Sequence, residues 1–199
     1  MTKRRTLSIA LAGLGLLLLA SLAAGCGSSE PSHDYGGWHP DYTKALAGSP
    51  AKLAALHEQA DELLPGGKDA FEARIASLSG FPVVANVWAS WCDPCRAEFP
   101  SLQRVSAHYG KRVAFLGVNS EDSDDTARTF LEEAPLSYPS YTDPDREISG
   151  SLKITGFPGT AYYGRDGELC YVKFGQYPDQ EALEADVRRY AVGSACESG

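Results

Sequence analysis

The stretch Trp91-Cys92-Asp93-Pro94-Cys95 decides how the fold of this 199-residue sequence is interpreted. Residues 82–89, just before it, form an apolar and β-branched run that is typical of a buried strand. Residues 96–109, just after it, repeat apolar side chains every three or four positions, which predicts a helix. A Cys-x-x-Cys pair between a strand and a helix is the usual context of a redox-active dithiol. We therefore predict a redox site at residues 92–95.

The two cysteines are expected to play different roles. Cys92 falls at the helix N-terminus, where free N–H groups and the helix dipole stabilise a thiolate, so it is the predicted nucleophile. Cys95 lies one turn further in and is expected to resolve the mixed disulfide. Asp93 disfavours the neighbouring thiolate, which favours a reducing rather than an oxidising couple. Arg96 is expected to offset part of this effect.

Two alternatives for the cysteine pair are less favoured. A zinc site needs two further ligands, and neither the remaining cysteines (Cys26, Cys170 and Cys196) nor the four histidines show ligand spacing. A purely structural disulfide between Cys92 and Cys95 would restrict the unfolded chain very little, because the ring is so small. We expect neither a metal nor another cofactor.

The N-terminus carries an export signal. Lys3-Arg4-Arg5 precedes an apolar run over residues 7–24, as in a signal peptide. Leu22-Ala23-Ala24-Gly25-Cys26 resembles a bacterial lipoprotein signal, which implies cleavage after residue 25 and lipidation of Cys26. An ordinary cleaved signal and an uncleaved membrane anchor remain alternatives. All three export the domain, and the lipoprotein interpretation places it on the extracytoplasmic face of a bacterial cell membrane. Residues 26–40, rich in Gly, Ser and Pro, are then expected to form a flexible tether.

Charge and compartment limit the possible partners. Without the three basic residues of the signal, the formal net charge changes from −8 to −11. Such an acidic surface argues against binding to nucleic acid and against electrostatic adhesion to anionic lipid. Export permits disulfides, so Cys170 and Cys196 either form a structural disulfide or are two independent residues.

The rest of the chain predicts an α/β domain behind a helical extension. In the extension, residues 41–79, Ser49-Pro50 starts a helix whose apolar face comprises Leu53, Leu56, Ala60 and Leu63, and Asp69 caps a second helix. The domain, residues 80–191, is expected to have a second strand, parallel to the first, at 111–119. Further elements are expected at 126–133 (helix), 143–144 (start of a short helix), 160–163 and 168–174 (hairpin strands) and 179–191 (helix). Residues 192–199 form a tail.

Three features resemble the thioredoxin-like thiol:disulfide oxidoreductases of the TlpA/ResA type. The string over residues 87–100 is close to the active-site string of that family and includes its Glu-Phe-Pro ending. Asn86 occupies the strand position where ordinary thioredoxins carry a buried aspartate. Residues 155–160, Thr-Gly-Phe-Pro-Gly-Thr, match the cis-proline loop, although Gly159 stands where threonine is usual. The resemblance implies a thioredoxin-like fold, a central mixed sheet flanked by helices, and it fails over residues 41–79.

The resemblance also implies roles for further residues. Glu98 would be a partly buried carboxylate that exchanges protons with Cys95, whereas the sequence alone would favour a surface glutamate. Pro158 would be cis and would present a backbone edge to an extended substrate. Trp91 and Phe157 would line the substrate site with it.

Together these observations predict an exported, membrane-anchored thiol:disulfide oxidoreductase. The resemblance implies that the protein reduces disulfide-containing proteins, for example apocytochromes c, and that it receives electrons from a membrane protein. We expect a monomer. A disulfide-forming oxidase on the same fold is the nearest alternative. A lipoprotein binding module with a non-catalytic cysteine pair is another, and a thiol peroxidase is less favoured.

Overall fold

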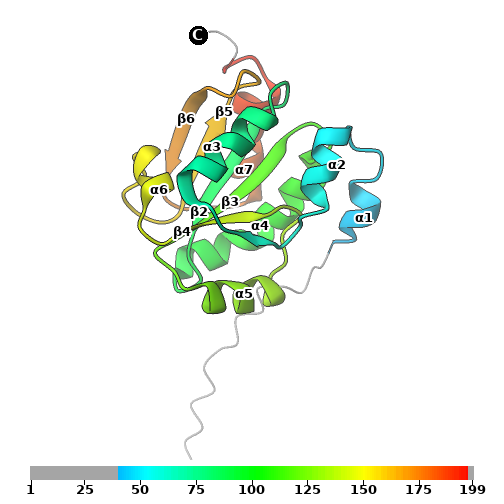
Figure 1. Ribbon diagram of the computed structural model, residues 1–199. Helices are drawn as coiled ribbons and strands as arrows, with labels where there is room; N and C mark the ends of the chain where they lie inside the picture. Colours follow the sequence, from blue (N-terminus) through cyan, green and yellow to red (C-terminus); the bar gives the residue numbers. More distant parts are fainter. Residues whose placement is uncertain (1–39, 197–199) are drawn as a thin grey trace, which may run out of the picture. The chain divides into compact units, whose positions relative to one another are not determined.

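Six strands form one mixed sheet in the computed structural model, which describes residues 40–196 (Figure 1). The strand order across the sheet is β1-β4-β3-β2-β5-β6. The strands are β1 (Leu63–Leu64), β2 (Val83–Trp88), β3 (Ala114–Ser120), β4 (Ser140–Asp143), β5 (Gly159–Tyr163) and β6 (Leu169–Phe174). The helices are α1 (Tyr42–Ala45), α2 (Ala51–His57), α3 (Gly67–Ser77), α4 (Asp93–Tyr109), α5 (Asp124–Glu133), α6 (Glu147–Ser151) and α7 (Gln180–Asp186), which continues as a π-helix, η1 (Val187–Val192).

The direction of the strands defines the fold. β1, β4, β3 and β2 run parallel to one another, β5 is antiparallel to β2, and β6 is antiparallel to β5. Helix α4 crosses between the parallel strands β2 and β3, as the sequence predicts. The predicted thioredoxin-like fold, with a mixed sheet flanked by helices, is therefore confirmed.

Strand β2 lies at the centre of the molecule and is buried on both faces. Val84 and Trp88 belong to one apolar cluster, together with side chains of α4, α5, α7 and η1. Val83, Ala85 and Val87 belong to a second cluster, formed with α2, α3 and α6. Because both faces are covered, the strand has a continuous apolar sequence rather than an alternating one.

The helical prediction for residues 41–79 is wrong at Leu63. Helix α2 ends at His57, and Leu63 lies in β1, paired in parallel with Ser140 of β4. The backbone N–H of Ser140 donates to the carbonyl of Glu62 at 2.8 Å, so this segment extends the sheet. Leu63 is buried as predicted, but its strand partner is 77 residues away in sequence, where helical periodicity gives no signal.

Other boundaries shift for local reasons. The helix expected at Asp143-Pro144 begins at Glu147, because the Asp143 carboxylate accepts hydrogen bonds from the N–H groups of Ile148 and Ser149. The helix expected at 126–133 begins two residues earlier, at Asp124, because Ser123 caps α5. The predicted hairpin around residues 164–167 joins β5 and β6.

Candidate active site

The cysteine pair lies at the start of α4. Cys92 is the N-cap of the helix, and its sulfur accepts a hydrogen bond from the N–H of Cys95 at 3.2 Å. Pro94 stands in the first turn, where its missing N–H costs no hydrogen bond. The two cysteines form a disulfide, and both are nearly buried, with exposed fractions of 4% for Cys92 and 1% for Cys95. This position supplies the unpaired N–H groups that stabilise a thiolate on Cys92 after reduction.

Glu98 lies one turn after Cys95 on the buried face of α4, with only 2% of its surface exposed. Its Oε1 accepts a hydrogen bond from the N–H of Tyr177 at 2.8 Å, and its Oε2 accepts one from Nδ2 of Asn86 at 3.1 Å. Burial raises the pKa of Glu98 to about 7, although both hydrogen bonds and the charge of Lys173 act in the opposite direction. The carboxyl can therefore take up or release a proton near neutral pH.

A groove of about 370 Å³ borders Cys92. Trp91 and Phe157 form two of its walls, and their rings meet edge to face with centroids 5.6 Å apart. The Trp91 side chain is 58% exposed, although its Nε1 donates to the carbonyl of Glu121 at 2.8 Å. The peptide bond between Phe157 and Pro158 is cis. The groove thus joins the nucleophilic cysteine to an exposed apolar rim.

The lining of the groove also contains an ion pair that sequence patterns do not indicate. Arg146 lies 3.0 Å from Glu121, and its guanidinium stacks over the ring of Phe157 at 5.4 Å. Both charged residues have positive φ angles, 53° for Glu121 and 61° for Arg146. Such backbone conformations are uncommon for residues other than glycine and occur often at functional sites.

Two charged residues near the dithiol differ in their surroundings. The guanidinium of Arg96 lies 4.4 Å from the centre of the Phe130 ring and 3.7 Å from Glu133, and it donates to the carbonyl of Ser90. The expectation that Arg96 partly offsets the effect of Asp93 on the Cys92 thiolate stays a prediction. Asp122, by contrast, holds the loop before Cys92 by accepting hydrogen bonds from the N–H and hydroxyl of Ser90.

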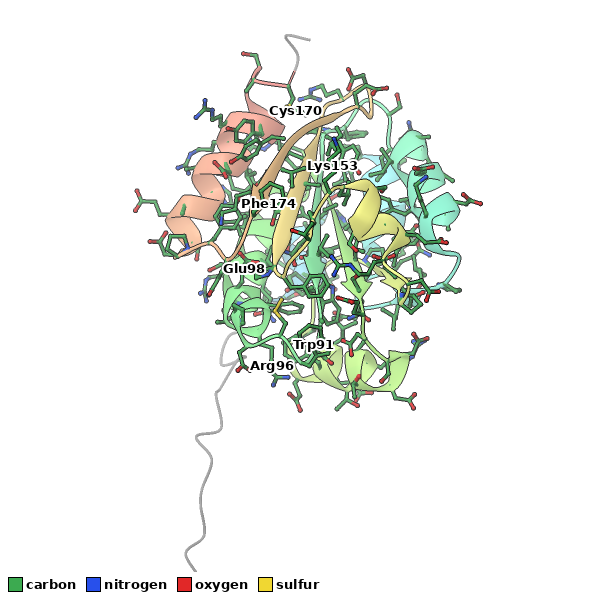
Figure 2. The ribbon with its side chains drawn as sticks, turned by 90° about the vertical axis from the view of Figure 1, so that its left-hand side faces the viewer. Trp91, Arg96, Glu98, Lys153, Cys170 and Phe174 are labelled. Carbon is green, nitrogen blue, oxygen red and sulfur yellow. A yellow bond between two sulfur atoms is a disulfide. The ribbon has the colours of Figure 1, made fainter. Side chains whose placement is uncertain are left out.

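The second cysteine pair is remote from the first. Cys170 and Cys196 form a disulfide that ties the chain after η1 to β6. Figure 2 shows Cys170 near one end of β6, whereas Phe174, at the other end, lies on the side of Glu98 and Trp91. Of the other sites predicted from sequence, Cys26 and the signal at residues 1–25 lie outside the described residues.

Residues 40–196 contain no cluster of three or more His, Cys, Asp or Glu side chains that could hold a metal ion. In the same range, no helix has the length and apolar character that crossing a membrane requires.

Curated proteins resemble this chain in sequence. The chain is 31% identical over 102 residues to the thiol-disulfide oxidoreductase ResA of Oceanobacillus iheyensis, covering 51% of this chain and 53% of ResA. It is 32% identical over 101 residues to the thiol:disulfide interchange protein CycY of Rhizobium leguminosarum bv. viciae, covering 50% and 53% of the two chains. The chain thus spans about half the length of these curated relatives. The TlpA/ResA-type resemblance is confirmed.

The solved structures agree with this assignment. A crystal structure of a Chlorobium tepidum protein described as a thiol:disulfide interchange protein, DsbE, superposes with a TM-score of 0.53 at 30% identity. The superposition covers 57% of this chain and 82% of the other. The model of the AhpC/TSA family matches residues 57–172, a range that includes β1, the dithiol and the cis-proline loop. The chain therefore belongs to the AhpC/TSA family.

Proposed function

We propose that the protein is an extracytoplasmic thiol:disulfide oxidoreductase that reduces disulfides in other proteins. The observation that carries the proposal is the position of Cys92 and Cys95 at the N-terminus of α4, beside a groove and a cis-proline loop. The names of ResA, CycY and DsbE, which describe disulfide exchange, support the same activity.

The proposed reaction transfers two electrons. The Cys92 thiolate attacks one sulfur of the substrate disulfide, and the other substrate sulfur leaves as a thiolate. Cys95 then attacks the Cys92 sulfur of the mixed disulfide, which releases the second substrate thiolate. The substrate is left reduced, and Cys92 and Cys95 are left as the disulfide seen in the structure. A thiol donor must reduce this disulfide before the next cycle.

Glu98 is the proposed proton partner of Cys95. The thiol of Cys95 must lose its proton to resolve the mixed disulfide, and a carboxylate with a pKa of about 7 can accept it. Glu98 and Cys95 both lie on the buried face of α4, one turn apart. Deprotonation inside the protein would otherwise require water to reach a cysteine that is only 1% exposed.

The substrate is proposed to bind along the groove as an extended segment. Trp91 and Phe157, which line the groove, would contact it next to its disulfide, together with Pro158 of the cis-proline loop. The carbonyl of Pro158 already accepts a hydrogen bond from the N–H of Gly175 at 2.9 Å, so added-strand pairing would use the loop residues before Pro158. Phe174, which is 59% exposed, extends the apolar rim on the β6 side.

The proposed setting is the outer face of a bacterial membrane, with the mature chain held through a lipid on Cys26. Apocytochromes c, whose haem-attachment cysteines must be kept reduced, are the proposed example of a substrate. A membrane protein is the proposed electron donor. The TlpA/ResA-type resemblance and the export signal support these three assignments.

The activity is tested by reduction of insulin disulfides with a dithiol donor. The purified protein should accelerate insulin precipitation, and Cys92→Ser should reduce the rate to that of the donor alone. Full activity in Cys92→Ser would leave the binding module as the better interpretation. Catalysed oxidation of reduced proteins, without reduction of insulin, would favour the disulfide-forming oxidase.

A further inference from the structure

A single lysine organises the turn that follows β6. Nζ of Lys173 donates hydrogen bonds to the carbonyls of Phe174 at 3.0 Å, Gly175 at 2.6 Å and Gln176 at 2.8 Å. An ammonium has three N–H donors, so these three consecutive carbonyls use all of them. The backbone of this turn curves around the Lys173 ammonium, and Gly175 adopts a positive φ of 75° there. We call residues 174–177 the lysine-bound turn.

The lysine-bound turn contacts both parts of the dithiol site. The N–H of Gly175 donates to the carbonyl of Pro158 at 2.9 Å, which ties the turn to the cis-proline loop. The N–H of Tyr177 donates to Oε1 of Glu98 at 2.8 Å. One short segment thus supplies a hydrogen bond to the substrate loop and another to the buried carboxyl.

The far end of the turn is anchored separately. The Tyr177 hydroxyl lies 2.8 Å from the hydroxyl of Tyr162 in β5 and donates to Oδ2 of Asp186 in α7 at 2.8 Å. The Tyr177 ring also lies 4.7 Å from Nζ of Lys173, within the range of a cation–π contact. Only the middle of the turn therefore depends on the three carbonyl contacts of Lys173.

We propose that Lys173 is a positioning residue of the redox site, because it holds the lysine-bound turn against Glu98 and Pro158. This inference rests on the proposed function for its consequence in catalysis. Its structural part, the link from Lys173 to the Glu98 carboxyl, can be measured in the oxidised protein without any substrate.

Glu98 is surrounded by groups from several elements. Asn86 faces it from β2, the N–H of Tyr177 faces it from the turn, and Lys173 acts on it from β6. The hydroxyls of Tyr138 and Tyr162 lie close enough to feel its charge. On its own helix, Cys95 lies one turn earlier.

These surroundings determine the direction in which the pKa of Glu98 should change when Lys173 is replaced. Burial raises the pKa of Glu98, whereas the Tyr177 hydrogen bond and the Lys173 charge lower it. Replacing Lys173 with a neutral side chain removes one of the lowering effects directly. It also frees the Gln176 carbonyl, which shares a peptide unit with the Tyr177 N–H, so the hydrogen bond to Glu98 should weaken and the pKa of Glu98 should rise.

The test is the ionisation of Glu98, followed by ¹³C NMR of labelled glutamate carboxyls in the oxidised full-length protein. Glu98→Gln assigns the resonance. Lys173→Met should raise the titration midpoint by about 0.5 pH unit or more, a roughly threefold change in proton affinity. Lys111→Met, which removes the same charge from an exposed lysine after α4, should leave the midpoint unchanged.

A second variant covers the case in which Lys173→Met does not fold. Lys173→Gln keeps a donor for part of the turn and should give a smaller rise in the same direction. Unchanged midpoints in the folded Lys173 variants, or an equal rise in Lys111→Met, would overturn the inference.

The catalytic consequence is tested by the pH profile of insulin reduction. Lys173→Met should move the profile in the wild-type background and should not move it when Glu98→Gln is already present. A further shift in that background would show that Lys173 does not act through Glu98 and would overturn the catalytic part. If the wild-type protein reduces no disulfide, the proposed function fails, and the carboxyl titration still decides the positioning role.

Discussion

The two disulfides of this chain lie in different elements, the first at the start of α4 and the second between β6 and the chain after η1, and they have opposite properties. Cys92 and Cys95 are three residues apart, nearly buried, and placed where a helix N-terminus meets a groove. Cys170 and Cys196 are 26 residues apart, and Cys170 is solvent-exposed on β6. Under the proposed function the first disulfide exchanges with a bound substrate, whereas the second ties the end of the chain to β6.

Loop length explains why the two bonds differ in their effect on stability. In the chain-entropy account, closing a ring of about 26 residues stabilises the folded state by roughly 3.5 kcal/mol, and closing one of about three residues by roughly 1.5 kcal/mol. A bond that opens in every catalytic cycle should contribute little to stability. The folded state should therefore tolerate opening of the Cys92–Cys95 disulfide at a small cost in stability, whereas it depends more on the Cys170–Cys196 disulfide.

The largest expected difference is in turnover. Cys95→Ser removes the resolving thiol, so Cys92 should stay bonded to the first substrate molecule and turnover should fall to the background rate. The double variant Cys170→Ser/Cys196→Ser should keep the wild-type rate. The measurement is insulin reduction together with non-reducing gel electrophoresis of the mixed disulfide. A large loss of rate in the double variant would remove the distinction between the two bonds.

The next difference is in stability. Urea unfolding of the oxidised proteins should show a loss of roughly 3.5 kcal/mol for Cys170→Ser/Cys196→Ser and of roughly 1.5 kcal/mol for Cys92→Ser/Cys95→Ser. In excess reductant, which opens both disulfides, the wild type and the two double variants should have similar stabilities. Equal losses in the two double variants would contradict the loop-length explanation.

The dithiol end of the molecule should also show a pH dependence that the other end lacks. The pKa of Glu98 is raised from 4.5 to about 7 in the folded state, so between these values the folded protein holds a proton that the unfolded chain has lost. The stabilisation is complete below pH 4.5 and disappears as the pH rises through 7. Relative to Glu98→Gln, the wild type should lose about 3 kcal/mol of unfolding free energy over this window.

Urea unfolding of both proteins at pH 4.5 and pH 7.5 measures this effect. The comparison with Glu98→Gln cancels the contribution of Asp61, whose pKa is also raised by burial, to about 6. A constant difference between the two proteins across the window would mean that Glu98 titrates in the folded state as it does in the unfolded chain.

The smallest expected effect is on the reduction potential. We expect a value closer to about −270 mV than to about −120 mV for the dithiol, because Asp93 disfavours the thiolate. Asp93→His should raise the potential by about 30 mV or more, equivalent to about 1.4 kcal/mol, because an imidazolium stabilises the thiolate. Equilibration with glutathione, followed by mass spectrometry of both cysteine pairs, measures the shift, and the Cys170–Cys196 pair serves as the internal control.

The sequence predicted those parts of the site that depend on local spacing. The strand, the dithiol and the helix are contiguous, so Cys92 at the N-cap and Glu98 one turn after Cys95 follow from helical geometry. The burial of Glu98 needed the family resemblance, because a glutamate in a helix is usually exposed.

The missed features depend on contacts between distant segments. β4 has four residues, two of them Ser and Asp, so it shows no strand periodicity, and β1 is recognisable only through its pairing with β4. From the sequence alone, Lys173 is an ordinary polar residue of β6, a strand at the edge of the sheet. Its contact with three carbonyls becomes visible only when the turn after it is folded.

The two outer strands have a consequence for how copies of this protein meet each other. One edge of the sheet is β1, only two residues long, and the other is β6, where the register shifts at Cys170 opposite Tyr162 and Tyr163. Long, flat edges expose rows of unpaired N–H and C=O groups on which a second chain can pair, whereas short or bulged edges do not. Both edges of this sheet are thus poor templates for intermolecular β-pairing, which protects the folded protein against aggregation.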